Sequence, residues 1–353
     1  MNKVHIHNLL RYNAKHFFKG INHTFLYYFQ GAQRLHPILL NDEQINEAID
    51  ELCTIGDLLR WGTSQFNGSD IFYGHGNDNA WDEAVALTLF ALNLPADSKD
   101  SILTSRLTKT ERTTIVNLFA TRINERMPVA YLTNSAWFAG EQYYVDERVL
   151  VPRSPIAQMI QADFQPWIGN KPVLRALDLC TGSGCIAIAM AHQFQEAEVD
   201  AIDISYDALE VATMNIFDHG VEERVIPIQS DLMNEVLREK YDLIVSNPPY
   251  VDQEDMDSLP QEFIHEPELG LAAGFDGLDL VKRILVDALD CLNDDGILVV
   301  EVGNSLVHME QQFPTVEFNW VDFQLGGHGV FVLTKAQLQA HHAEFKAALN
   351  ALI

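Results

Sequence analysis

The sequence is poor in positive charge. Its 353 residues include 23 Lys and Arg against 50 Asp and Glu, which gives a formal net charge of −27. Proteins that bind duplex DNA use Lys and Arg to displace counterions from the phosphates, so this acidic chain is a poor candidate for a DNA-binding protein. A hydrophobic content of 47% is typical of a folded globular protein, and the length allows about two domains.

Cysteine is also scarce, and long apolar runs are missing. The four cysteines include no C-x-x-C pair and the 13 histidines form no H-E-x-x-H pattern, so we expect no metal site. So few cysteines are typical of reduced thiols in a cytoplasmic enzyme rather than of a disulfide framework. No segment approaches the ~18 consecutive apolar residues of a membrane span, so we expect no membrane partner.

Negative charge is absent from the first 41 residues. Five basic residues give this segment a charge of +5 and leave −32 for the rest of the chain, namely Lys3, Arg11, Lys15, Lys19 and Arg34. Interspersed aromatic residues are compatible with a targeting or RNA-contacting arm, but the apolar run at 25–29 is too short for a secretory signal. Because disorder concentrates at chain ends, we favour a poorly ordered basic extension over 1–40, or an over-long gene start.

Helical periodicity begins at Asn41. Apolar residues recur at helical spacing over 45–59, and we expect Gly62 to end this first helix. A second helix is expected near 80–92. A third begins at Thr108 with the capping-box spacing T-x-x-E and ends at Met127-Pro128. We therefore predict a small N-terminal helical domain over 41–135.

Strand patterns dominate the rest of the chain. Residues 136–152 alternate in character and are rich in aromatics, which predicts a β-hairpin linker. Beyond Pro166 strands alternate with helices; the expected strands are 173–179, 198–203, 224–229, 241–246 and 296–303, then 317–324 and 329–334. A helix is expected between each pair of the first five. Repeated βα steps predict an α/β fold with a doubly wound, mostly parallel sheet and a terminal antiparallel hairpin over 153–335, then a C-terminal helix over 336–353.

A glycine-rich turn follows the first strand of this sheet. Its sequence runs Asp178-Leu179-Cys180-Thr181-Gly182-Ser183-Gly184 and leads into a helix. The two glycines allow a ligand to approach the backbone at the helix N-terminus. With Ala187 the turn also fits the relaxed dinucleotide pattern G-x-G-x-x-A, and Asp203, at the end of the second strand, suits ribose hydroxyls in either case. The alternative is a glycine turn that only packs strand against helix.

The acidic residue before the glycines favours S-adenosylmethionine over a dinucleotide. A carboxylate at Asp178 would repel a pyrophosphate, but it suits the cationic or zwitterionic methionine part of S-adenosylmethionine. After the third strand comes Ser230-Asp231-Leu232, where Asp231 can bond the adenine amine and Leu232 can cover the ring. The alternative for this tripeptide is an ordinary helix cap.

The most specific pattern is Asn247-Pro248-Pro249-Tyr250, directly after the strand expected at 241–246. The prolines fix the backbone and leave carbonyls free to accept hydrogen bonds. The Asn247 side-chain oxygen and the Pro248 carbonyl can then point to one spot beyond the strand ends, where ligands bind in such sheets. Two such acceptors fit an –NH₂ group, and Tyr250 can stack on a planar amide or base. A rigid surface loop is the alternative, but the coincidence with the strand end favours catalytic roles for Asn247, Pro248 and Tyr250.

Together these motifs resemble the class I S-adenosylmethionine-dependent methyltransferases that methylate planar amino groups. Phe138-x-Gly-x-x-Tyr-x-Val, followed by Val-Leu-Val-Pro-Arg153, is similar to glutamine methyltransferases that act on peptide-chain release factors and on a ribosomal protein, as are His265-Glu-Pro267 and Gly274-Phe-Asp-Gly277. The resemblance covers roughly 46–339 and implies a seven-stranded Rossmann-like sheet. It implies a cofactor site made of Asp178, Cys180, Thr181, Gly182, Ser183, Gly184, Asp203, Asp231, Leu232 and Asn247.

One feature narrows the branch of the family. Release-factor enzymes usually have P-R-P-E-T-E after the hairpin, whereas this chain has Pro152-Arg153-Ser154-Pro155-Ile156, with Tyr73-Gly-His-Gly76 and Trp81-Asp-Glu83 upstream. The chain is closely similar to the branch that methylates large-subunit ribosomal protein three. The resemblance implies a substrate site formed by Pro152, Arg153 and 247–250, although Arg153 could equally be a structural salt-bridge partner.

The implied partner is that ribosomal protein in its free form, before or during ribosome assembly. The ribosomal protein is basic and binds RNA. The acidic part of this chain, residues 42–353, would therefore attract the free ribosomal protein and repel the assembled ribosomal subunit. The resemblance also assigns substrate recognition to the helical domain. The sequence leaves the oligomeric state open.

Three alternatives remain at this stage. The first is a release-factor glutamine methyltransferase. The second is a DNA amino-methyltransferase, which would need a basic target-recognition domain that the acidic body does not provide. The third is a non-catalytic cofactor-binding or ribosome-assembly module, which the intact Asn-Pro-Pro-Tyr beside a complete cofactor loop argues against.

Overall fold

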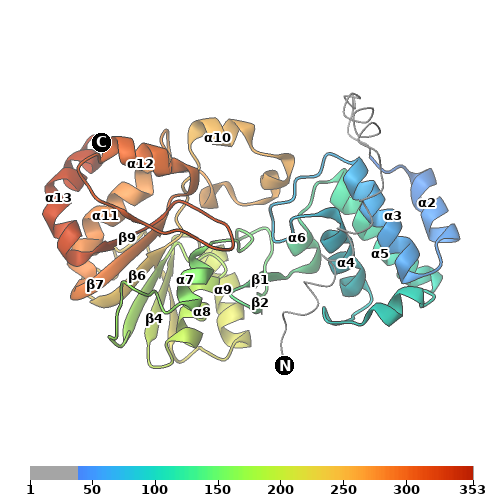
Figure 1. The fold of residues 1–353 in the computed structure, drawn as a ribbon, viewed down its shortest axis with the longest axis horizontal. Coiled ribbons are helices and arrows are strands. Elements are labelled where there is room, and N and C mark those ends of the chain that lie inside the picture. The colour runs from blue at the N-terminus through green and yellow to red at the C-terminus, as the bar shows by residue number, and fades with distance from the viewer. Residues whose placement is uncertain (1–38, 353) are drawn as a thin grey trace. The chain divides into compact units, whose positions relative to one another are not determined.

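The first part of the chain folds into helices with a core of their own. The computed structural model describes residues 39–352, so nearly all of the basic extension expected over 1–40 lies outside the described residues (Figure 1). The helices are α2 (Asp42–Glu51), α3 (Ile55–Gly68), α4 (Ala80–Ala91), the short 3₁₀ helix η2 (Asp100–Thr104), α5 (Lys109–Asn124) and α6 (Val129–Thr133). Leu58, Phe66 and Phe119 lie at the centre of their core. The capping box expected at Thr108 is present at the start of α5.

The first predicted helix is wrong in extent, because it is two helices. The hydroxyl of Thr54 accepts a hydrogen bond from the Asp57 N–H (3.1 Å), and the Asp57 carboxylate accepts one from the Thr54 N–H (2.9 Å). This capping box starts α3 as a separate helix. Gly62, expected to end the first helix, lies inside α3. A Cβ at Gly62 would lie 2.4 Å from the Phe119 ring, so the glycine allows α3 and α5 to pack closely.

The predicted hairpin is present but shorter than expected. Strands β1 (Ala136–Phe138) and β2 (Glu141–Tyr143) pair in antiparallel fashion around a two-residue turn, Ala139-Gly140, with φ values of 51° and 95°. The expected hairpin continued to Pro152, but residues 144–152 form no strand. The side chain of Asn215 bonds both the N–H (2.8 Å) and the carbonyl (3.0 Å) of Tyr144, which are the groups that a longer strand would pair.

A seven-stranded sheet follows, and its doubly wound topology confirms the prediction. The strands are β3 (Arg175–Leu179), β4 (Glu198–Asp203), β5 (Val225–Gln229), β6 (Tyr241–Ser246), β7 (Leu292–Glu301), β8 (Asn319–Trp320) and β9 (Val330–Thr334). Their order in the sheet is β5-β4-β3-β6-β7-β9-β8. The first five are parallel, and β9 runs antiparallel to both β7 and β8, so the terminal antiparallel hairpin is also confirmed. Strand β8 is much shorter than the strand expected near 317–324.

Helices cover both faces of this sheet (Figure 1). They are α7 (Ile156–Gln161), α8 (Cys185–Gln193) and α9 (Tyr206–Asp218) on one face, and α11 (Asp279–Cys291) and α13 (Lys335–Asn350) on the other. Successive strand residues alternate between the two cores: Leu243 and Val245 face the first group of helices, and Ile244 faces the second. Because both faces are buried, the central strands are almost wholly apolar.

Two connections differ from the expected βα pattern. Only turns join β5 to β6, where a helix was expected. Leu232, in this connection, has φ of 51°, a left-handed conformation that a right-handed helix cannot contain. After β6, residues 247–278 precede α11, and we call them the β6–α11 insert. The insert contains α10 (Gln253–Ser258) and the 3₁₀ helices η3 (Gln261–His265) and η4 (Glu268–Gly270).

The last part of the chain adds short helices before the terminal hairpin. After β7 come η5 (Gly303–Ser305) and α12 (Leu306–Gln312). Within residues 39–352, no helix combines the length and the apolar character that crossing a membrane requires.

Candidate functional site

The site lies where the sheet changes direction. The chain places β4 and β5 on one side of β3 and then returns to place β6 on the other side. Ligands of such sheets bind at this switch point, beyond the carboxyl ends of the strands. Leu179 and Ser246 are partners in the β3–β6 ladder, so Cys180 and Asn247 leave the sheet side by side. A cavity of about 620 Å³ opens here, a size that suits a small-molecule ligand.

Most of the residues predicted from the sequence line this cavity. They are Cys180, Thr181, Gly182, Ser183, Asp203, Asp231 and Leu232 from the cofactor set, and Pro152, Arg153, Asn247, Pro248, Pro249 and Tyr250 from the substrate set. Two predicted residues do not line it. Asp178 is fully buried. Gly184 is the N-cap of α8, where a Cβ would lie 3.2 Å from the Cβ of Ala212 on α9.

Asp178 lies beneath the glycine-rich loop and ties it together. Its Oδ2 accepts hydrogen bonds from the Thr181 hydroxyl (2.6 Å) and the Ala187 N–H (3.1 Å). Its Oδ1 is buried and has no hydrogen-bond partner among the described residues. Burial raises the pKa of Asp178 to about 7. The carboxyl group therefore supports the loop with one oxygen, while the other oxygen remains a free acceptor.

Asp203 holds the same loop from the end of β4. Its carboxylate accepts hydrogen bonds from the Gly182 N–H (2.9 Å) and the Ser205 N–H (2.9 Å). Burial raises the pKa of Asp203, and these hydrogen bonds oppose the rise. A carboxylate has about four acceptor positions, so Asp203 can still bind hydroxyl groups of a ligand. No atom lies within 4 Å of the position of a Cβ on Gly182, so the loop is open to a ligand there.

Cys180 lies in a conformation that cysteine rarely adopts. Its φ of 59° is left-handed and costs a non-glycine residue roughly 1–2 kcal/mol. Burial raises the pKa of its thiol well above the ordinary value. The side chain is therefore a neutral part of the cavity wall and is unsuited to nucleophilic chemistry.

Asp231 is paired with an arginine that the sequence analysis missed. The Arg283 Nη2 lies 2.8 Å from the Asp231 Oδ2, and Arg283 also lines the cavity. Arg283 belongs to α11, far from Asp231 in the sequence, and no motif marks it. Leu232 beside this pair is buried and lines the same part of the cavity.

Asn247 presents a free acceptor in the cavity. Its Oδ1 is buried without a hydrogen-bond partner among residues 39–352. An unsatisfied buried acceptor lowers the stability of the folded protein by about 1–3 kcal/mol. We therefore expect the Asn247 Oδ1 to accept a hydrogen bond when a ligand is bound. The position fits a ligand that donates hydrogen bonds.

Tyr250 is fixed as a rigid wall beside Asn247. Its hydroxyl donates to the Glu301 Oε1 (2.8 Å), and the Ser154 hydroxyl donates to the Glu301 Oε2 (2.5 Å). Burial raises the pKa of Glu301, and these hydrogen bonds oppose the rise. The Tyr250 ring lies against Gly303, where a Cβ would approach it to 2.5 Å. Because the hydroxyl is bound to Glu301, the ring face is the part of Tyr250 available to a ligand.

Arg153 both lines the cavity and forms a salt bridge. Its guanidinium donates two hydrogen bonds to Glu266, at 2.5 and 2.8 Å, and Glu266 also accepts from the Val151 N–H (3.0 Å). Burial alone would raise the pKa of Glu266, but His75 and Arg153 lower it to about 2. Arg153 is therefore a structural salt-bridge partner, the role that the sequence left open, and it also lines the cavity.

Several residues of the site were not predicted from the sequence. Phe72, Phe263 and Arg283 line the cavity, and Glu301 supports it from below. One available signal was the single acid that ends the apolar run Ile-Leu-Val-Val-Glu301, because a lone charge in a buried strand needs a specific partner. Within the described part of the chain, no group of three or more His, Cys, Asp or Glu side chains is arranged to bind a metal.

Comparison with known proteins decides the family. The model of the methyltransferase small domain family matches residues 169–275. A ribosomal protein uL3 glutamine methyltransferase of Xanthomonas campestris pv. campestris is 49% identical over 304 residues, which cover 86% of this chain and 98% of the relative. A protein of the same name from Neisseria gonorrhoeae is 49% identical over 294 residues, which cover 83% of this chain and 98% of the relative. This chain belongs to the family of ribosomal protein uL3 glutamine methyltransferases.

Membership in the uL3 glutamine methyltransferase family confirms the predicted family, and with it the class I methyltransferase fold. The chain is an enzyme that transfers methyl groups, and its methyl donor is S-adenosylmethionine. Among solved structures, a ribosomal protein L11 methylase from Lactobacillus delbrueckii subsp. bulgaricus matches 51% of this chain and 75% of its own chain, at 21% identity and a TM-score of 0.35. The cavity fits the donor, because it combines an open glycine loop with the carboxylate of Asp203.

Proposed function

We propose that this protein transfers a methyl group from S-adenosylmethionine to the side-chain amide nitrogen of a glutamine in ribosomal protein uL3. The observation that carries the proposal is the buried, unpartnered Oδ1 of Asn247 in the cavity that also contains the cofactor loop. The names of the two relatives support the choice of substrate. An amide nitrogen with two hydrogens is the kind of group that such an acceptor binds.

Each part of the donor has a counterpart in the cofactor half of the cavity. S-adenosylmethionine supplies an electrophilic methyl group on a positively charged sulfur. Asp203 would accept hydrogen bonds from the ribose hydroxyls, and Asp178, buried beneath the loop with its Oδ1 unpartnered among the described residues, would provide the counter-charge of the amino group. Asp231, held by Arg283, accepts from the adenine amine, and Leu232 covers the ring.

The residues after β6 make the amide reactive. A glutamine amide nitrogen is a weak nucleophile because its lone pair is delocalised into the carbonyl. The Asn247 Oδ1 and the Pro248 carbonyl accept its two hydrogens, hold the nitrogen toward the methyl group and favour its pyramidal form. Tyr250 packs against the plane of the amide. Positioning of this kind can supply up to ~7–11 kcal/mol of the barrier, so no strong base is needed, and the proton leaves to water after transfer.

In this proposal the enzyme binds uL3 before it is incorporated into the ribosome. The helical region, 41–135, recognises it, and the catalytic region, 153–335, modifies it. The net charge of −32 on residues 42–353 attracts a basic ribosomal protein before ribosomal RNA covers that protein. The reaction then takes place in the cytoplasm, where ribosomes assemble.

A direct test uses labelled S-adenosylmethionine and purified ribosomal proteins. The protein is incubated with uL3 free of RNA, with an assembled large subunit, with a release factor and with duplex DNA, and products are located by mass spectrometry. We expect one methylated glutamine in free uL3 and much less label in the other three. Label that appears only in the release factor or the DNA would refute the proposed substrate.

A further inference from the structure

We propose that Phe263 is a specificity-determining residue, which packs against the substrate chain beside the target glutamine. Glu262, its neighbour in η3, is the positioning residue that holds Phe263 in place through contacts with the helical region. The inference rests on the proposed function. It assigns a role to η3 of the β6–α11 insert and to Phe72, which lie outside the predicted site.

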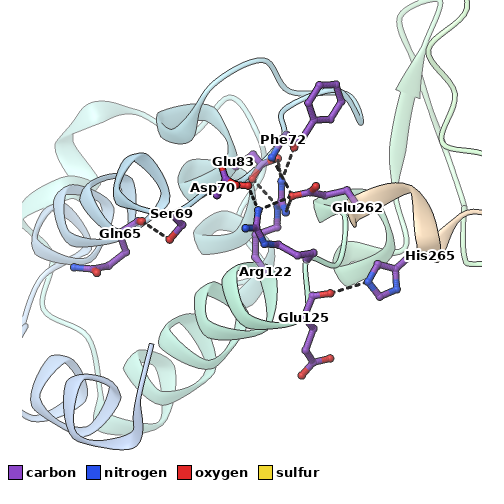
Figure 2. Close-up of polar contacts among 10 residues, drawn as sticks. Gln65, Ser69, Asp70, Phe72, Glu83, Arg122, Glu125, Glu262 and His265 are labelled. Atoms are coloured by element: carbon purple, nitrogen blue, oxygen red, sulfur yellow. Dashed lines mark hydrogen bonds and ion pairs between the residues drawn. The ribbon is translucent and has the colours of Figure 1, made fainter. Parts of the chain in front are cut away.

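Glu262 ties η3 of the insert to the helical region. Its Oε1 lies 3.1 Å from the Arg122 Nη1 and 3.3 Å from the Arg126 Nη1, and it accepts a hydrogen bond from the Phe72 N–H at 3.0 Å. Figure 2 shows Glu262 reaching from the insert to Arg122, which also binds the carbonyl of Phe72 (2.9 Å) and both oxygens of Glu83. Arg122 is 0% exposed and Glu262 1%. Burial would raise the pKa of Glu262, but the Phe72 N–H and Arg122 keep it below the ordinary value.

Two further contacts fix the other end of η3. Glu266, one residue beyond η3, forms the paired hydrogen bonds with Arg153 described above. His265 lies with its Nε2 2.8 Å from the Glu125 carbonyl, as Figure 2 shows. A turn of five residues is thus anchored at Glu262, His265 and Glu266, which fixes the backbone from which Phe263 projects.

Phe263 and Ile264 lie between these anchors; Phe263 lines the cavity, whereas Ile264 is exposed and does not line it. The Arg153 guanidinium carbon lies 5.3 Å from the centre of its ring, and the ring centres of His75 and Phe72 lie at 4.7 and 5.7 Å. Phe263 and Phe72 line the same cavity as Asn247 and Tyr250. Both aromatic side chains therefore line the cavity; Phe263 lies beside Arg153 of the predicted substrate set, and Phe72 comes from the helical region.

This arrangement explains how the helical region could choose a substrate. A rigid aromatic surface gives contact area at a low cost in conformational entropy, and such residues dominate binding energy at interfaces. The amide itself is bound by Asn247 and Pro248, so a contact outside it must be made by the neighbouring substrate residues. Phe263 therefore affects the affinity for the protein substrate and leaves cofactor affinity unchanged.

The first test is Phe263→Ala, with Phe90→Ala as the matched control. Phe90 lies on α4, is 46% exposed and does not line the cavity. We expect Phe263→Ala to raise KM for free uL3 about tenfold or more, with S-adenosylmethionine Kd within about twofold of wild type. Phe90→Ala should change neither. An unchanged KM in a folded Phe263→Ala protein would overturn the inference.

The second test is Glu262→Gln, with Glu83→Gln as its control. Both changes remove one buried carboxylate charge beside Arg122, but only Glu262 belongs to the insert. We expect both variants to lose stability, and only Glu262→Gln to raise KM for uL3, by about threefold to tenfold with kcat nearly unchanged. An equal rise in KM in both variants, or none in Glu262→Gln, would overturn the positioning role.

The activity of the wild-type protein on uL3 distinguishes a wrong role for Phe263 from a wrong proposed function. If wild-type protein does not methylate uL3 at all, the proposed function fails. If wild type is active on uL3 and Phe263→Ala has the same KM, the function stands and the role of Phe263 is wrong. S-adenosylmethionine binding by calorimetry shows in either case that the variants are folded.

Discussion

Asp178 gives the protein a stability that depends on pH. Burial raises its pKa from the ordinary 3.8 to about 7, and its Oδ1 has no partner among the described residues to compensate for the charge. At 1.36 kcal/mol per pH unit, the ionised form costs the folded protein of the order of 4 kcal/mol. The unfolded chain loses this proton at lower pH than the folded one does. The contribution of Asp178 to the free energy of unfolding is therefore highest below about pH 4 and decreases as the pH rises to about 7.

The substitution Asp178→Asn tests this reasoning. The amide oxygen can keep the bonds to Thr181 and Ala187, but the new –NH₂ group has no acceptor and costs about 1–3 kcal/mol. At pH 8 we expect the variant to be more stable than wild type by about 1–3 kcal/mol. At pH 4 the gain should vanish or reverse, because the wild-type carboxyl group is then protonated.

Urea unfolding of both proteins between pH 4 and 8 measures the difference. Asp97→Asn, which changes an exposed side chain, is the control for the loss of a carboxylate and should not reproduce the gain in stability at pH 8. Parallel curves of stability against pH for wild type and Asp178→Asn would refute the argument. The variant should also bind S-adenosylmethionine more weakly, because it loses the proposed counter-charge of the amino group.

Two more predictions concern Tyr250. In Tyr250→Phe the buried Glu301 loses one of its two hydroxyl partners. We therefore expect the free energy of unfolding to decrease by about 1–3 kcal/mol. An unchanged free energy of unfolding in urea titrations would contradict the role of this hydrogen bond. In Gly303→Ala the new Cβ would lie 2.5 Å from the Tyr250 ring, at a φ of 48°. We expect kcat to fall about tenfold to hundredfold with cofactor Kd nearly unchanged, and a normal kcat would show that the ring need not be held in place.

The features that the sequence predicted are those encoded locally. The strand before Asn247 is a continuous apolar run, and the prolines after it fix the chain without help from elsewhere. The capping box at Thr108 is equally local. These patterns led to the sheet, to the cavity at its edge and to most of the residues that line it.

The features that were missed depend on partners far away in the chain. Arg122 and Glu262 are 140 residues apart, and Arg153 and Glu266 are 113 apart. Gly62 was predicted to end a helix because the sequence does not show that the Phe119 ring packs against it. The turns between β5 and β6 depend on a left-handed Leu232, a conformation that no residue pattern indicates.

The central claim is that Asn247 holds the amide during transfer, and Asn247→Ala tests it most directly. The measurement is the rate of methyl transfer to free uL3 at saturating S-adenosylmethionine, together with cofactor Kd by calorimetry. Removing one such positioned group typically costs a factor of about 10²–10³, so we expect a loss of that size in rate with cofactor Kd within about threefold. A variant that binds the cofactor poorly but transfers methyl groups at a comparable rate once saturated would contradict the claim.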